Sequence, residues 1–481
     1  MQKRTKIIAT IGPASDSQEA IEALLHEGVD VFRLNFSHGT HQYHSEVLQK
    51  IRQAEKNTGL LVGVLQDISG PKVRIGDLKD SFELQENDSI EFLKEELTGY
   101  PVNKHKYRIS INQPQILDQL KVGDPVYLYD GMIRTIVTQS TAFSVTVKVE
   151  NRGVLSSKKG INFPNTFLDI DIITAKDKKD ILWGIQNDID FMAISFVQSA
   201  DDMLQARKIL EEQEANIQLF AKIEKLDAIK NIDSILEVSD GIMIARGDLG
   251  IELPFYEVPS LQKRLIQKAN NASKPVITAT QMLLSMTDKE RATRAEISDI
   301  ANAVLDGTDA VMLSEESAVG KHPSLVVKTM VQTIKGAERD YPFDKFDTFE
   351  LRDATDSVNE SAVKLCQSVD AWGLICVTAS GASARKIARY RPQRDIYAVV
   401  HTPKIARFLT ICWGVVPAFH VEQSSLSQMI KQVISEGKER KILYTDRSYI
   451  LTAGDPMGAE GSTNTIRLLR RREMEFFHDL P

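Results

Sequence analysis

Charged residues at the ends of two apolar runs are the first chemical signal in this sequence. The segments 217–224 (IQLFAKIE) and 240–254 (DGIMIARGDLGIELP) each predict a buried parallel strand. The first run ends in Lys222 and Glu224, and the second carries Asp248. Two carboxylates could hold a hard divalent cation, while an ammonium group stabilises a phosphoryl or enolate oxygen. The alternative is a salt-bridged rim, because ion pairs are common at strand ends.

Apolar runs of the same kind recur along the chain and predict the elements that must position these residues. Residues 226–240 carry isoleucines at helical spacing, so one helix is expected to connect the two strands in a right-handed crossover. The same rhythm predicts eight strands, at 6–12, 29–39, 60–74, 190–196, 217–224, 240–254, 275–282 and 309–317. Eight strands alternating with helices indicate a closed (β/α)₈ TIM barrel, with a doubly wound sheet as the rival.

In such a barrel the carboxyl ends of all strands meet on one face. The polar residues near these ends are therefore expected to share one pocket: Arg33, Asn35, Ser37, Asp67, Lys222, Glu224, Asp248, Thr280 and Ser314. A rim of ion pairs does not need polar residues at the same end of so many strands. The pattern therefore favours an active site.

Two other regions depart from the barrel rhythm. From about Val73 to Asp169 short alternating segments predict a small inserted β domain, expected to be a β-barrel. After residue 345 strands and helices alternate again and predict a smaller α/β domain, ending in a charged surface helix or frayed tail. The expected division is 1–72 and 170–345 for the barrel, 73–169 for the inserted domain and 346–481 for the C-terminal domain.

Composition narrows the class of protein. The 481 residues carry 59 basic and 66 acidic side chains, a net charge of −7, so neither nucleic acid nor an anionic membrane is an expected partner. Three cysteines without metal-ligand spacing, and no signal-like or membrane-spanning run, predict a reduced, cytoplasmic protein. Anionic substrates would need a local cluster of basic residues.

Eight motifs, in this order, resemble those of the pyruvate kinase family: TKIIATIGPAS, RLNFSHG, GPKVR, AKIE, ARGDLG, ATQML, TRAE and VMLSEESA. The resemblance spans nearly the whole chain. It implies transfer of the phosphoryl group of phosphoenolpyruvate to ADP, giving pyruvate and ATP, with Mg²⁺ or Mn²⁺ as the divalent metal. It also implies the barrel, the inserted domain, the C-terminal α/β domain and a homotetramer.

Residue roles follow from the resemblance. Glu224 and Asp248 are expected to hold the metal, with Lys222 and Arg33 at the phosphoryl group. Gly247 and Asp248 resemble positions that receive the substrate carboxylate. Thr280, Ser314 and Glu316 resemble residues that protonate the enolate; a β-branched residue filling a strand end is the plain alternative for Thr280.

The resemblance also implies a nucleotide site. Arg74 and Lys159 look like the family's basic residues around the nucleotide, with His38 and Asn35 beside them. Such a cluster would let an acidic protein bind two polyanions. For His38, a hydrogen-bonded loop histidine is the alternative.

The segment QDISGPKVR departs from the commonest family pattern. Asn35, Ser37, Asp67 and the residue at Ile68 match a site that holds potassium in relatives with glutamate at the position of Lys72. Here an ammonium replaces that carboxylate, so we expect the enzyme to work without K⁺. A solvated surface lysine is the alternative.

The turn TASGAS of the C-terminal domain resembles the family's effector loop. Thr378, Ser380, Gly381 and Ser383 are expected to bind a phosphate, and the short loop 452–462 favours a sugar monophosphate or AMP over a bisphosphate. A plain Ser383 N-cap is the alternative.

Two other functions compete. A metal-dependent aldolase or lyase would use the same carboxylates, but not the inserted domain, Lys222 in the phosphoryl path or the basic cluster. A degenerate, non-catalytic relative should have lost at least one of Lys222, Glu224, Asp248 or Thr280, and all four are present.

Overall fold

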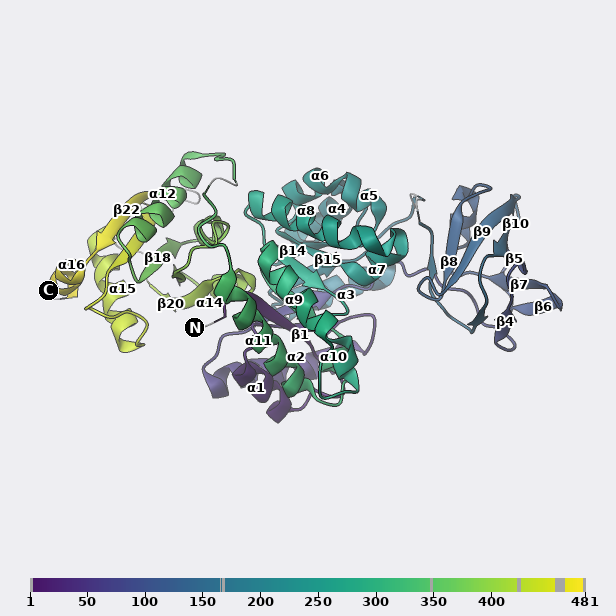
Figure 1. The fold of residues 1–481 in the computed structure, drawn as a ribbon, viewed down its shortest axis with the longest axis horizontal. Coiled ribbons are helices and arrows are strands. Elements are labelled where there is room, and N and C mark those ends of the chain that lie inside the picture. The colour runs from purple at the N-terminus through teal and green to yellow at the C-terminus, as the bar shows by residue number, and fades with distance from the viewer. Residues whose placement is uncertain are drawn as a thin grey trace.

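Three bodies lie in a row along the molecule. The computed structural model describes residues 3–164, 166, 169–346, 349–421, 425–454 and 463–478. Figure 1 shows the barrel in the centre, the inserted sheet domain at one end and the C-terminal domain at the other. The inserted domain and the C-terminal domain therefore lie at different ends of the barrel.

Eight parallel strands form a closed barrel, which confirms the predicted fold. The pairing runs β1-β17-β16-β15-β14-β13-β3-β2 and returns to β1. Every residue of most of these strands is buried, because the interior is filled by side chains and helices cover the outside. The strands are β1 Lys6–Thr10, β2 Val31–Asn35, β3 Gly63–Asp67, β13 Phe191–Ile194, β14 Gln218–Ile223, β15 Gly241–Ala245, β16 Val276–Ala279 and β17 Ala310–Leu313.

Several barrel helices begin at a residue whose side chain caps them. Thr174 and Thr293, for example, form capping boxes with Asp177 and Glu296. The outer helices are α1 Gln18–Glu27, α2 His41–Thr58, α3 Ala175–Gln186, α4 Ala200–Glu212, α5 Leu226–Lys230, α6 Ile232–Val238, α8 Val258–Asn271, α9 Arg294–Asp306 and α11 Pro323–Ala337.

Two expectations about these elements were wrong. The single helix predicted over 226–240 is two helices, α5 and α6, with Asn231 between them. The run 240–254 is a strand only to Ala245, and α7 (Arg246–Glu252) starts at once. A second short helix, α10 (Glu315–Ala318), follows β17 in the same way. Both short helices lie at the active-site face of the barrel.

The inserted domain is made of short strands, as predicted. Seven of them form one sheet in the order β12-β8-β9-β10-β5-β7-β6, and β11 pairs with β4, a more open arrangement than a small barrel. Burial alternates along β5 and β10, so one face packs on a core around Ile90 and Val147. The strands are β4 Phe82–Leu84, β5 Ser89–Leu93, β6 Tyr100–Asn103, β7 Lys106–Ser110, β8 Pro125–Leu128, β9 Ile133–Ser140, β10 Ser144–Val149, β11 Gly153–Leu155 and β12 Ile161–Asn162.

The C-terminal domain is a five-stranded α/β sheet in the order β20-β19-β18-β21-β22, with β22 antiparallel. The charged tail is helix α16, and it docks through buried Met474 and Phe477. The elements are α12 Ala354–Ser368, β18 Gly373–Thr378, α13 Ala382–Ala388, β19 Asp395–Val400, α14 Pro403–Phe408, β20 Val415–His420, α15 Leu426–Glu439, β21 Tyr449–Gly454, β22 Thr463–Leu469 and α16 Arg471–His478.

A buried ion pair fastens the C-terminal domain to the barrel. Arg391 lies 3.1 Å from Asp309, and both side chains are almost fully buried. Among the described residues, every helix is either too short or too polar to cross a bilayer.

Candidate active site

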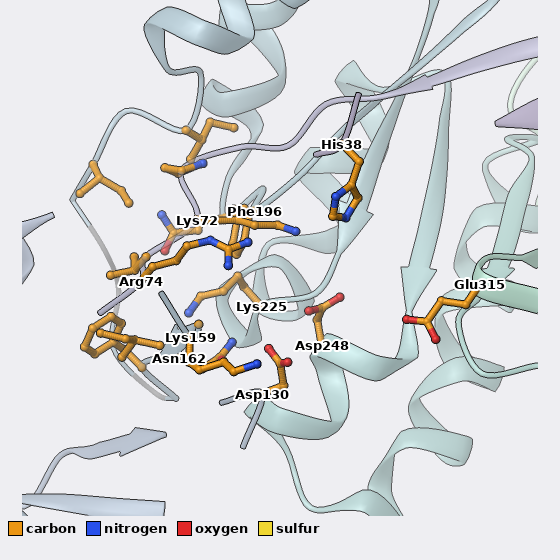
Figure 2. A pocket seen from close by; sticks show the side chains of 18 residues that line it. His38, Lys72, Arg74, Asp130, Lys159, Asn162, Phe196, Lys225, Asp248 and Glu315 are labelled. Carbon is orange, nitrogen blue, oxygen red and sulfur yellow. The ribbon is translucent and has the colours of Figure 1, made fainter. Parts of the chain in front are cut away.

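The carboxyl ends of the barrel strands open toward the inserted domain, and two adjoining cavities lie there. The smaller, about 380 Å³, is lined by residues from both bodies, among them Lys72, Arg74 and Lys159. The wider, about 1250 Å³, reaches Thr280 and Ser314. Asp130, Asp248 and Glu315 line both. In Figure 2 the basic side chains gather on one side of the smaller cavity and face the carboxylates of Asp248 and Asp130.

Lys222 lies at the centre of a buried polar network. Its ammonium donates to Ser195 Oγ at 2.7 Å and lies 3.4 Å from both Asp67 Oδ1 and Glu224 Oε2. Burial alone would lower the pKa of Lys222, but Asp67, Glu224 and Asp248 outweigh burial and raise it. The group is therefore a fixed positive charge.

Arg33 supplies a second fixed positive charge beside the first. Its guanidinium contacts Asp67 Oδ2 through Nε at 2.8 Å and Nη2 at 2.7 Å, and Nη1 donates to Thr10 Oγ1 at 2.9 Å. Burial opposes ionisation of Asp67, but Lys222 and Arg33 prevail and lower its pKa. The Asp67 carboxylate thus holds both the Lys222 ammonium and the Arg33 guanidinium in fixed positions.

Glu224 and Asp248 fit a divalent cation. Burial raises the pKa of Glu224 to about 7, and the nearby charge of Asp248 adds to this rise against the opposing effect of Lys222. The backbone N–H of Phe196 donates to Glu224 Oε1 at 2.6 Å and fixes the carboxylate. Within the described residues no group of three or more His, Cys, Asp or Glu could hold a metal. A cation here would take two protein carboxylates and complete its shell with substrate or water oxygens.

Thr280 lies on a strained turn. Thr280 and Gln281 both have positive φ, 73° and 57°, which is unfavourable for a β-branched residue. Arg246 holds this turn: its Nη2 donates to Thr280 O at 2.8 Å, and its Nη1 pairs with Asp299 at 2.7 Å. The Gly247 N–H donates to Thr280 Oγ1 at 2.7 Å, so the start of α7 and the end of β16 are joined.

Ser314 and Glu316 differ in exposure. Glu316 is buried and accepts bonds from the backbone N–H of Ser314 at 2.7 Å and of Leu283 at 3.1 Å. Ser314 is half-buried at the wall of the wider cavity. Glu316 therefore holds the backbone at Ser314 and Leu283, and Ser314 is the one of the two acid–base candidates that lies nearer to the cavity.

The expected nucleotide residues lie partly together. Arg74, Lys159 and His38 line the smaller cavity. Arg74 Nη1 donates to Lys158 O at 2.9 Å, and Lys159 lies over the Tyr129 ring at 4.0 Å.

His38 is exposed, and its neighbours disfavour a positive charge on it. Burial of part of the ring, and the charges of Lys72, Arg74 and Arg33, lower the pKa of His38. The structure does not bring Asn35 to the cavity wall, because its Oδ1 accepts the Ser37 N–H at 3.1 Å in a local turn.

Carbonyl groups in the region expected to hold a monovalent cation already accept hydrogen bonds from protein side chains. The Ile68 side chain is in the core, and its carbonyl accepts from Ser195 Oγ at 2.7 Å. Lys176 donates to the Phe36 carbonyl at 2.8 Å. Lys72 is exposed at the cavity wall, and burial of its stem and the charge of Lys222 lower its pKa, opposed by Asp248 and Glu224. An ammonium group thus lies among the active-site charges.

The expected effector residues are mostly internal. Thr378 Oγ1 accepts the Gly381 N–H at 3.0 Å, and Ser383 Oγ is 2.5 Å from Thr463 Oγ1 on β22. Thr378 and Ser383 are buried, whereas Ser380 is half-buried. Residues 455–462 of the expected loop 452–462 lie outside the described residues.

Several residues near the site had no role in the sequence interpretation. Ser195 bonds Lys222, Arg246 holds the Thr280 turn, and Asp130 and Lys225 line the smaller cavity. Arg246 and Lys225 gave a signal only as charged residues at the ends of apolar runs, and Ser195 stands inside the strand predicted at 190–196. Asp130 lies in the inserted domain, where nothing in the pattern set it apart.

Comparisons with known proteins agree across the chain. Residues 2–327 match the model of the pyruvate kinase barrel domain, and residues 356–469 match that of the pyruvate kinase alpha/beta domain. The chain is 40% identical to the pyruvate kinase of Staphylococcus aureus (strain MRSA252) over 477 residues and to that of Geobacillus stearothermophilus over 476. Each alignment covers 97% of this chain and 80% of the relative. The crystal structure of a pyruvate kinase from Cryptosporidium parvum superposes with a TM-score of 0.91 at 34% identity, covering 98% of this chain and 96% of that one.

Proposed function

This chain belongs to the pyruvate kinase family, and from that premise we propose how its own residues carry out the reaction. The enzyme transfers the phosphoryl group of phosphoenolpyruvate to ADP and forms pyruvate and ATP. The observation that supports our assignment most is the fixed ammonium of Lys222 between Asp67 and Glu224. A lactate dehydrogenase-coupled assay tests the function: pyruvate should form from phosphoenolpyruvate only when ADP is present. Release of pyruvate together with inorganic phosphate in the absence of ADP would instead indicate hydrolysis of phosphoenolpyruvate, with water as the phosphoryl acceptor.

Lys222 and Arg33 would stabilise the phosphoryl group in flight. Negative charge spreads over its oxygens in the transition state, and positioned cations in a dry site stabilise that charge strongly. Asp67 holds both cations in place, so no reorganisation is needed as the charge develops.

The divalent metal used by this family would be held by Glu224 and Asp248, as Mg²⁺ or Mn²⁺. When bound, it would supply positive charge at the substrate carboxylate and phosphoryl oxygens. In the first turn of α7, the backbone N–H of Asp248 would orient the substrate carboxylate, and the N–H of Gly247 could join it only by leaving Thr280 Oγ1, to which it donates at 2.7 Å. The nucleotide would be contacted by Arg74, Lys159 and His38. Asn35 would support the turn that leads to His38, because its Oδ1 accepts the Ser37 N–H.

Thr280 and Ser314 would deliver the proton that converts the enolate to pyruvate. The Thr280 hydroxyl donates to Ala279 O at 2.6 Å and accepts the Gly247 N–H at 2.7 Å, which fixes its oxygen; to protonate the enolate, its O–H would have to rotate away from Ala279 O. Glu316 would keep Ser314 in place from behind.

Replacing Arg246 should impair this step without unfolding the barrel. In Arg246→Met the positive-φ turn at Thr280 loses its bond to the guanidinium, and we expect kcat to fall roughly tenfold, because small misplacements of reacting groups are costly. Deuterium exchange of pyruvate, followed by NMR, should fall in parallel. Arg207→Met is the control, since Arg207 pairs with Asp240 at 2.7 Å but lines neither cavity. Equal losses in both variants would contradict this role for Arg246.

We further propose that this enzyme needs no potassium. Lys72 lines the cavity together with Asp248 and feels the charges of Lys222 and Glu224, and by the family resemblance it stands where potassium-dependent relatives have a carboxylate. Asn35, Ser37, Asp67 and the Ile68 carbonyl would be the remnant of the ion site. In tetramethylammonium buffers at constant ionic strength, adding potassium should change the rate less than threefold. A rise above about tenfold, worth some 1.4 kcal/mol, would contradict the proposal.

We also propose an effector site in the C-terminal domain, at Thr378, Ser380, Gly381 and Ser383, for a sugar monophosphate or AMP. The half-buried Ser380 and the Gly381 turn support it, while the hydroxyls of Thr378 and Ser383 would have to leave their internal partners. Titration with glucose 6-phosphate, ribose 5-phosphate and AMP should activate the parent enzyme severalfold and should not activate Ser383→Glu. No response of the parent to any of the three would remove the proposal.

The tetramer is proposed from the family alone, whereas the location and the domain bounds are proposed from the sequence pattern. We propose a cytoplasmic homotetramer with the barrel at 1–72 and 170–345, the inserted domain at 73–169 and the C-terminal domain at 346–481. Light scattering of the purified chain would test the tetramer.

A further inference from the structure

Lys225 is a buried ammonium at the smaller cavity that the mechanism above does not use. It follows Glu224 in sequence and lies just past the end of β14. Only 7% of its side chain is exposed, yet it lines the cavity together with Lys72, Arg74 and Lys159. Figure 2 shows Lys225 on the same side of the cavity as Arg74 and Lys159.

A buried carboxylate holds Lys225 in place. Its Nζ donates to Glu252 Oε1 at 3.0 Å, and the Glu252 side chain is 2% exposed. Glu252 is the last residue of α7, the helix that carries Asp248 in its first turn. In the part of the chain that the structure describes, Glu252 is the one recorded partner of the ammonium. Since a lysine has three N–H donors, two remain for a ligand in the cavity.

Fold stability alone does not explain this pair. Exchanging a buried ion pair for apolar residues is often neutral or stabilising, because desolvation offsets the attraction between the charges. A fixed ammonium with spare donors at a cavity wall is, by contrast, what a phosphate ligand requires.

The cavity must also accept a polyanion. Lys72, Arg74 and Lys159 lie at or beyond the junction with the inserted domain, whereas Lys225 belongs to the rigid barrel. A nucleotide diphosphate held only by the first three would lack a contact on the barrel side of this wall, where Asp248 repels it.

We propose that Lys225 is a further nucleotide-binding residue, which donates a hydrogen bond to a phosphate oxygen of ADP from the barrel side of the cavity. Glu252 acts as its positioning residue. This inference rests on the proposed nucleotide site at Arg74 and Lys159.

The test is a set of calorimetric titrations with MgADP. Loss of one charge-assisted hydrogen bond in Lys225→Met should weaken ADP binding about tenfold to a hundredfold. Phosphoenolpyruvate binding, followed by intrinsic fluorescence, should change less than twofold. Glu252→Gln keeps the ammonium but removes the charge that positions it, so ADP affinity should fall by roughly threefold, less than in Lys225→Met.

Two further variants keep the result interpretable. Lys225→Met/Glu252→Leu removes both charges, so the fold is retained even if a lone Glu252 is destabilising, and the loss of ADP affinity should persist. Lys230→Met is the matched control, because Lys230 lies on α5, pairs with Asp227 at 3.1 Å and is exposed.

The outcomes separate the alternatives. If Lys225→Met and Glu252→Gln weaken ADP and phosphoenolpyruvate binding alike, the pair is only structural and the proposal is overturned. Normal ADP affinity in Lys225→Met, with weakened affinity in Lys159→Met, overturns the role of Lys225 and leaves the nucleotide site standing. Normal affinity in both variants overturns the nucleotide site itself, and the inference with it.

Discussion

Lys222→Met should abolish phosphoryl transfer while pyruvate still exchanges its methyl protons with solvent. The lysine is assigned to the charge on the migrating phosphoryl group, and losing a fixed cation in a dry site costs at least about a thousandfold in kcat. Enolisation of pyruvate is instead assigned to the metal proposed at Glu224 and Asp248 and to Thr280. We expect deuterium incorporation into pyruvate, measured by NMR with Mg²⁺ present, to stay within about tenfold of the parent.

The control for this variant is Lys208→Met. Lys208 is exposed, lies 4.0 Å from the carboxylate of Glu212 and lines neither cavity. The control variant should lose nothing in either reaction. A Lys222→Met enzyme that kept phosphoryl transfer within about tenfold, a loss below 1.4 kcal/mol, would show that the ammonium does not stabilise the transition state. Equal loss of both reactions would show a general disturbance of the site.

Lys72→Glu should turn the enzyme into a potassium-dependent one. The change replaces a positive by a negative charge beside the phosphoryl path. For illustration, a two-unit change of charge about 8 Å from one unit of developing negative charge costs on the order of 4 kcal/mol at an effective dielectric constant of about 20. We therefore expect a rate at least about a hundredfold lower in tetramethylammonium buffer, and partial rescue when potassium binds near Asn35, Ser37 and Asp67.

Lys79→Glu is the matched control, because it makes the same charge change at an exposed lysine of the inserted domain. Its rate should not depend on potassium. A Lys72→Glu enzyme as active as the parent without potassium would identify Lys72 as a solvated surface lysine. A slow variant that no monovalent cation rescues would show that the ion site itself is lost.

The barrel could be predicted because its strands are continuous apolar runs, each closed by polar residues. The details of the connections between these strands could not be predicted. Ile229, Ile232 and Ile235 keep helical spacing across the break between α5 and α6, since both helices face the same core. The break depends on Asn231, whose side chain donates to Gln198 O at 2.9 Å, a partner 33 residues away. Periodicity along the chain carries no information about such contacts.

The site shows the same division. That Lys222, Glu224 and Asp67 would lie together followed from their places at parallel strand ends, and in the structure they do. Ser195 and Lys225 were missed because their importance comes from tertiary contacts, with Lys222 and Glu252. The roles assigned to these residues remain predictions until the variants above are measured.

Closure of the barrel has a consequence for biosynthesis. The first strand, β1, completes its pairing only with β17, where Lys6 meets Ala310. At a translation rate of about 5–20 residues per second, β17 is synthesised roughly 15 to 60 s after β1. The inserted sheet has all its strands by Asn162 and can fold in the meantime. During synthesis, the inserted domain is thus expected to be folded while the barrel still exposes unpaired strand edges. We therefore expect chaperones to bind the nascent barrel.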